Sequence, residues 1–172
     1  MTHFGRLGIG LGAAAASLAL SGAASANEPE AVATYSDWSV FVREVDGDKI
    51  CFAATEAADK SPKTVTHGGV FFLVATWESG AAKHQPSLMT GYNMDDRPKP
   101  SLRIGSEKWD MYVSKNEAFI ESDREENTLV SAMRKGADMR VSAVSARGTA
   151  TSYNVSLRGV TKALERAESA CR

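Results

Sequence analysis

The sequence contains few of the residues that carry out catalysis or bind metals. Only three histidines and two cysteines occur among 172 residues. Neither His67 nor His84 has a carboxylate, a cysteine or a second histidine at helix or strand spacing, so no zinc motif is recognisable. Gly-x-Ser-x-Gly and Ser-x-x-Lys segments are also missing, and with them the usual signs of a catalytic serine. The sequence therefore predicts no catalytic residue, no cofactor and no metal site.

Long hydrophobic runs are almost absent too. The one long uncharged stretch, Leu7–Leu20, follows a basic residue and precedes the small residues Ala24-Ser25-Ala26, which is the pattern of a secretory signal peptide. It is too rich in Gly and Ala for a membrane span, which needs about 20 strongly apolar residues. No second run of spanning length follows, so we expect no transmembrane segment after signal removal.

These features predict the organisation of the chain and its compartment. We expect a signal peptide at residues 1–26, an irregular lead-in at residues 27–34 and one domain at residues 35–172. The mature protein would be exported to the periplasm, with association with the outer membrane and secretion both left open.

The chain lacks a strong excess of either charge, with a formal net charge of −1. A nucleic-acid-binding protein is therefore not expected. The charge is uneven, because residues 134–172 carry eight basic and three acidic side chains. Such a segment could attract an anionic envelope component such as a lipid headgroup, although solvated helix and strand surfaces explain it more simply.

The two cysteines lack the spacing of a metal site or a redox pair. In an exported protein, an even number of such cysteines predicts a disulfide, here between Cys51 and Cys171. The bond would close a loop of about 120 residues and add up to about 4–5 kcal/mol of stability in the chain-entropy model. We expect it to hold the C-terminal helix against an early strand.

Short alternating or apolar segments separated by turn residues predict a mainly β domain. The fold we expect is a sandwich-like antiparallel arrangement of roughly eight to ten strands, with one internal helix and one C-terminal helix. The alternative is an α+β domain with a single antiparallel sheet. We expect strands at 35–43, 49–55, 69–77, 87–92, 102–105, 109–113, 118–121, 139–143 and 151–157, and helices at 122–136 and 160–171.

Two of these elements support specific expectations. The continuous apolar segment Gly69–Trp77 predicts a strand buried on both faces, at the centre of the core. Ser122-Asp-Arg-Glu125 is a capping-box pattern that predicts the start of the internal helix.

Most of the mature chain also resembles a known family, and the C-terminal quarter carries the most specific part. The segments Met133-Arg-Lys-Gly136, Ser145-Ala-Arg-Gly-Thr149 and Tyr153-x-x-Ser-Leu157-x-Gly159-x-x-x-Ala163-Leu164, with an early Trp strand, a Cys in its partner strand and a terminal Cys, resemble the invasion-associated locus B family. The resemblance implies an exported, virulence-linked protein of the bacterial envelope with no defining enzymatic activity. Some members have further cysteines where this chain has Val42, so no second disulfide is carried over.

The resulting hypothesis is an exported, non-enzymatic envelope protein that binds an envelope or host protein, or an anionic envelope component. One alternative is a small hydrolase-like periplasmic enzyme whose site is built from His67, His84 and the segment Asp95–Arg97. The other is a carrier of a small ligand, which would require a deep apolar pocket.

Overall fold

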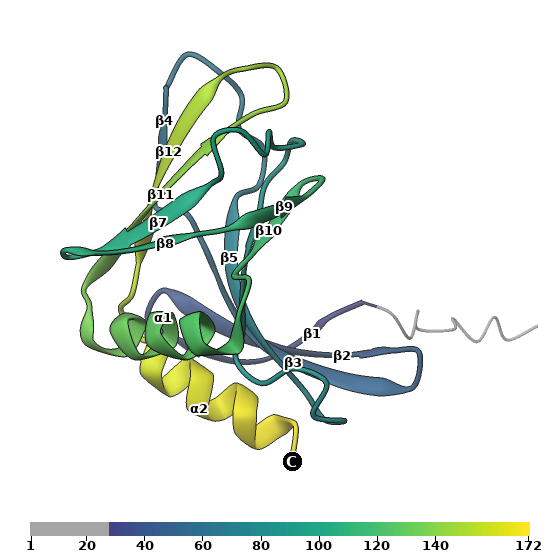
Figure 1. Ribbon diagram of the computed structural model, residues 1–172. Coiled ribbons are helices and arrows are strands. Elements are labelled where there is room, and N and C mark those ends of the chain that lie inside the picture. Colours follow the sequence, from purple (N-terminus) through teal and green to yellow (C-terminus); the bar gives the residue numbers. More distant parts are fainter. Residues whose placement is uncertain (1–27) are drawn as a thin grey trace, which may run out of the picture.

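The computed structural model describes residues 28–172, and these form two antiparallel sheets and two helices (Figure 1). The larger sheet has seven strands in the order β1-β2-β3-β5-β6-β10-β9, and the smaller has five in the order β4-β12-β11-β7-β8. The sandwich-like mainly β fold is thus confirmed, and the single-sheet alternative is wrong. The predicted signal peptide lies outside the described residues.

The strands of the larger sheet are β1 (Glu30–Tyr35), β2 (Trp38–Val45), β3 (Asp48–Glu56), β5 (Phe71–Trp77), β6 (Gln85–Met89), β9 (Tyr112–Ser114) and β10 (Glu117–Phe119). Those of the smaller sheet are β4 (Asp59–Ser61), β7 (Ser101–Ile104), β8 (Glu107–Asp110), β11 (Asp138–Val144) and β12 (Ala150–Ser156). The helices are α1 (Asp123–Lys135) and α2 (Val160–Ala170).

Three segments differ from the sequence-based expectation. Part of the expected lead-in forms β1, which pairs with β2 at the edge of the sheet. Part of the expected polar loop after β3 forms the short strand β4. The segment expected as one strand at 109–113 is divided at the buried residue Met111 between β8 and β9, which belong to different sheets. Periodicity alone cannot show such a change of sheet, because the alternation continues through it.

The helices close one end of the space between the sheets (Figure 1). Helix α1 begins at Ser122, whose side-chain oxygen accepts a hydrogen bond from the Glu125 amide, as the capping box predicts. Leu129 and Met133 of α1 and Leu164 of α2 are fully buried in the core. The fully buried Trp38 of β2 donates its indole N–H to the Ser156 carbonyl of β12 at 2.9 Å, which ties the sheets together.

Cys51 and Cys171, the pair expected from the sequence, form a disulfide between β3 and the end of α2. Their Cα atoms lie 5.7 Å apart, near the usual separation for such a bond. Cys51 is fully buried and Cys171 nearly so, so the bond is part of the core. Between residues 28 and 172, no helix has both the length and the apolar character that crossing a bilayer requires.

Replacing both cysteines by serine should lower the free energy of unfolding by about 2–5 kcal/mol, because the unfolded chain regains the freedom of a loop of about 120 residues. Urea unfolding of the double variant and of the wild type measures the difference. Adding reductant to the wild type should give a similar loss, whereas the double variant should not respond to it. Equal midpoints for wild type and double variant would contradict the stabilising role.

Candidate functional site

The larger sheet carries a continuous apolar surface on the side facing away from the smaller sheet. Strand β5 alternates fully buried residues with half-buried ones, so only one of its faces lies in the core. The expectation of burial on both faces is therefore wrong. We call this surface the outer apolar face, and its apolar members are Phe41, Ile50, Phe52, Ala54, Phe71, Leu73, Ala75, Trp77, Met89 and Phe119.

Strand register explains why these side chains gather. Phe41 pairs with Phe52, which pairs with Ala75, and Ile50 pairs with Trp77. Residues directly opposite one another in an antiparallel sheet point to the same face, so each pair adds a row to the surface. The Phe41 and Phe52 rings stack with centroids 5.3 Å apart. The twist of the sheet leaves a shallow hollow of about 460 Å³ over these rows.

The rim of the outer apolar face carries charges of both signs. The Arg43 guanidinium lies 6.0 Å from the centroid of the Phe52 ring, within the range of a cation–π contact. Glu117 of β10 lies at the other side of the hollow. Within residues 28–172, neither charge has an ion-pair partner within 4.0 Å. Both charges therefore remain available for a binding partner.

The two histidines considered for an enzyme site lie at opposite ends of β5. His67 precedes the strand and His84 follows it, and a seven-residue strand is about 20 Å long. Asp95 makes local contacts: its amide donates to the Val144 carbonyl and its carboxylate accepts from the Arg97 amide. The structure therefore does not bring the three predicted site segments together.

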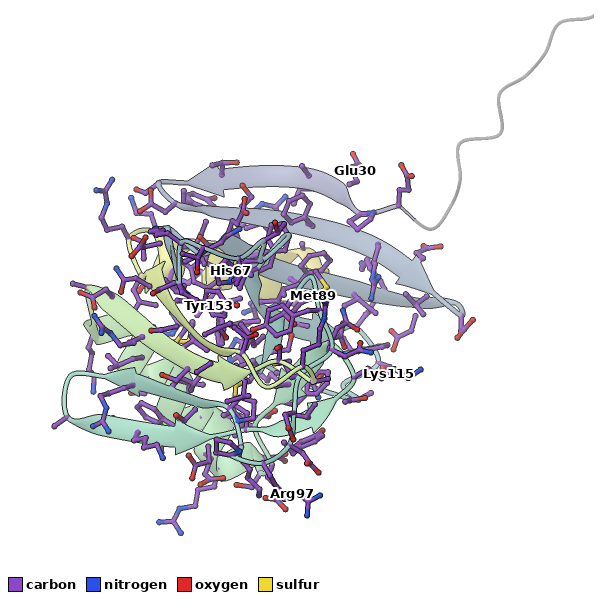
Figure 2. The ribbon with its side chains drawn as sticks, turned by 90° about the horizontal axis from the view of Figure 1, so that it is seen from above. Glu30, His67, Met89, Arg97, Lys115 and Tyr153 are labelled. Carbon is purple, nitrogen blue, oxygen red and sulfur yellow. A yellow bond between two sulfur atoms is a disulfide. The ribbon has the colours of Figure 1, made fainter. Side chains whose placement is uncertain are left out.

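His67 belongs to a buried hydrogen-bonded cluster between the sheets. Its Nε2 lies 2.8 Å from the Pro62 carbonyl and its Nδ1 lies 3.1 Å from the Tyr153 hydroxyl (Figure 2). Because a carbonyl can only accept, Nε2 donates to Pro62, and in that tautomer Nδ1 accepts from the Tyr153 hydroxyl. The Tyr92 hydroxyl lies 2.7 Å from both Tyr153 and Thr151 and can donate to Tyr153 in turn. Burial raises the pKa of Tyr153 well above its ordinary value of 10.0, so this hydroxyl remains a donor.

His84 faces the C-terminal helix. Its Nε2 is buried and 3.7 Å from Glu168 Oε2, too far for a hydrogen bond. Burial lowers the pKa of His84, and the Glu168 carboxylate opposes that shift. The Glu168 carboxylate also lies 3.2 Å from Arg172 and 3.6 Å from Lys83, so it has two permanently charged neighbours besides His84.

The basic residues of the C-terminal segment do not form one surface. Arg134, Arg158 and Arg172 each lie within 4 Å of a carboxylate. Arg147 and Arg158 are at opposite ends of β12. This arrangement favours the simpler interpretation, that most of these charges keep separate surfaces solvated.

Fold and surface together define a disulfide-closed β-sandwich whose larger sheet has a hollowed, half-buried apolar outer face. The family model for the invasion-associated locus B (IalB) protein matches residues 38–168, which is most of the chain. The chain belongs to the IalB family, as the resemblance indicated. Comparison with curated proteins and with solved structures gave no significant match.

The outer apolar face was missed in the sequence because β5 is apolar at every position except Thr76, which is buried on the core side. A run such as Phe71–Trp77 contains no polar residue that would mark the solvent side. The signal lay in the neighbouring strand β6, where Gln85, Ser87 and Met89 alternate with buried residues. Those residues pair with Ala75, Leu73 and Phe71 and so place the same face toward solvent.

Replacing Tyr153 by Phe should lower the free energy of unfolding by about 1–3 kcal/mol, because His67 Nδ1 loses its buried donor. Tyr112→Phe is the matched control, since Tyr112 is 43% exposed and its change should stay within about 0.5 kcal/mol. Urea unfolding near pH 7 measures both. Equal effects of the two substitutions would show that the buried cluster contributes nothing specific.

His84 should make the protein less stable in mild acid. Its folded pKa lies below the unfolded value near 6.5, so its contribution is complete above that pH and is lost as the pH falls below it. Unfolding measured at pH 8.0 and pH 5.5 should show a smaller loss in His84→Gln than in the wild type, because glutamine cannot be protonated. The same loss in both proteins would assign the pH dependence to other groups.

Proposed function

We propose that this protein is an exported, non-enzymatic binding protein of the bacterial envelope. In this proposal, the outer apolar face binds an apolar segment of another envelope protein. The observation that carries the proposal is that face itself. Its large apolar side chains are half-buried or buried, yet they line one continuous hollow that charged and polar residues border, and such an arrangement is typical of interaction sites.

The shape and charge of the surface favour a protein segment over a lipid bilayer. The face is hollowed rather than convex, and it spans several strands with aromatic side chains on both sides of β5. Arg43 and Glu117 offer one charge of each sign at its rim. An anionic membrane surface would be repelled by the glutamate, whereas a protein segment can provide a partner for each charge.

The environments of the histidines support binding rather than catalysis. Both ring nitrogens of His67 face partners within the fold, and His84 lies beside Glu168 at the far end of β5. Neither residue lies in the outer apolar face. A hydrolytic or redox activity that depended on one side chain would overturn this part of the proposal.

Family membership and the disulfide support export, because disulfides persist in oxidising compartments. The proposed location is the periplasm, with the protein attached to the outer membrane or released through contact with its partner. The family description adds an association with invasion, so the partner in a pathogen would be an envelope or host protein.

In-cell photo-crosslinking tests the proposal. A photoreactive phenylalanine analogue replaces Phe119, which lies in the outer apolar face, and crosslinked partners are identified by mass spectrometry. The matched control carries the same analogue at Ser142, which is exposed on β11 of the other sheet. We expect a reproducible protein partner from position 119 only.

Leu73→Glu in the same background should abolish that crosslink, because it places a charge in the middle of the hollow. Circular dichroism should show that the variant remains folded. Equal capture from positions 119 and 142, or capture that survives Leu73→Glu, would refute the proposed binding face.

A further inference from the structure

The loops that precede β5, follow β6 and join β11 to β12 lie at the end of the sandwich away from the helices (Figure 1). A second hollow lies between these loops. Its volume is about 300 Å³. The His67–Tyr153 cluster lies at its base, and Arg147 and Thr149 come from the β11–β12 turn. It is a different surface from the outer apolar face, because the two have no lining residue in common.

The loops around this hollow are fixed to one another. A Cβ at Gly91 would lie 2.8 Å from the His67 carbonyl oxygen and 2.9 Å from the Gly68 Cα, so only glycine allows this close approach. The Ala146 amide bonds the Asn93 carbonyl at 2.8 Å, which attaches the third loop to the second. A site held this way loses little entropy when a ligand binds.

The turn that presents Arg147 is also locked. The Ser145 amide bonds the Thr149 carbonyl, and the Thr149 amide bonds the Ser145 side-chain oxygen at 3.1 Å. Gly148 has φ +83°, which permits the tight turn. Arg147 itself is exposed and has no carboxylate within 4.0 Å among residues 28–172.

The lining is rich in hydroxyl groups and contains no carboxylate. Hydroxyls come from Thr66, Tyr92, Ser145, Thr149 and Thr151. Thr151 and Tyr92 are held in place by the buried cluster. One guanidinium is the only permanent charge in the lining, so the hollow is suited to a ligand with one negative charge and several hydrogen-bonding groups.

We propose that this hollow binds a small hydroxylated monocarboxylate of monosaccharide size, that is, a sugar acid. Its carboxylate would pair with Arg147 in the two-bond geometry that a guanidinium offers to a carboxylate. Its hydroxyls would exchange hydrogen bonds with Thr149, Ser145 and Tyr92. Val65, which is 39% exposed at the rim, would cover the apolar side of the sugar ring.

Size and charge both favour this ligand class. A hollow of about 300 Å³ is at the lower limit of ligand pockets and holds a ligand of roughly a dozen non-hydrogen atoms. A phosphate dianion would leave one negative charge unpaired beside the buried cluster. A neutral sugar would leave Arg147 without a partner.

Nuclear magnetic resonance titration of the mature protein tests the inference. The probes are D-glucuronate, D-galacturonate and D-mannuronate, with D-glucose as the uncharged control. We expect saturable amide shifts at residues 65–67 and 145–151 with at least one acid, with affinity in the millimolar range or tighter, and at least five-fold weaker binding of glucose. No saturable shift at these residues with any of the three acids up to 50 mM would overturn the proposal.

Arg147→Gln should weaken binding of the responding acid at least five-fold, and Arg124→Gln on the exposed start of α1 should leave it unchanged. Tyr92→Phe should also weaken binding, and its amide spectrum shows whether the fold is retained. Equal binding by wild type and Arg147→Gln would overturn the assignment. Because this site is separate from the outer apolar face, either proposal can fail without the other.

Discussion

The attachment of α2 to the larger sheet is the constraint on which the rest of the fold depends. The Cys51–Cys171 bond fixes the far end of the helix against β3, and Gly159 fixes its beginning. A Cβ at Gly159 would lie 1.9 Å from the Tyr35 carbonyl oxygen, and its φ of +93° is one that other residues adopt at a cost. Helix α2 therefore begins next to the β1–β2 turn and ends next to β3. Its buried residues close one end of the sandwich. With that end closed, the opposite end and the outer face of the larger sheet remain open to partners.

Local sequence patterns predicted most of the strands and helices. The predictions that failed concern features set by contacts between residues far apart in the sequence. The capping box at Ser122, the strands expected at 139–143 and 151–157 and the helix expected at 160–171 each depend on residues close in sequence, and the structure contains all of them. The division of 109–113 between two sheets could not be predicted this way, because Met111 is buried and keeps the alternation intact across the change. The burial of β5 could not be predicted for the same reason. Whether its second face is covered depends on where the smaller sheet lies, and the residues of the strand do not indicate this.

The candidate sites were less predictable than the fold because neither is formed by one stretch of sequence. His67 was noticed as a possible catalytic residue, yet its role depends on Tyr153, 86 positions further along the chain, and on Pro62. Both ring nitrogens have partners inside the fold, so the histidine can orient a hydroxyl. That hydroxyl belongs to Tyr153. The Tyr92 hydroxyl contacts both Tyr153 and Thr151, so the same hydrogen-bonded cluster also positions two residues that line the second hollow. A buried polar cluster of this kind is costly unless every member is satisfied, so its presence beneath the hollow requires a precise arrangement of the loops above it.

The segments that carry the family resemblance divide into two groups in the structure. Leu157, Ala163 and Leu164 are buried, and Gly159 allows a close backbone contact, so these residues are explained by packing. Arg147 is different: it is exposed, and its turn would close equally well with another residue between Ala146 and Gly148. The backbone of the turn therefore does not require a cation at that position, whereas the proposed ligand carboxylate would. The two open surfaces also differ in what they could bind, since an apolar hollow across several strands suits a protein segment and a small hydroxyl-lined one suits a soluble anion. A protein that engages an envelope partner with one surface and a sugar acid with the other could attach that partner to an acidic polysaccharide without any catalytic step.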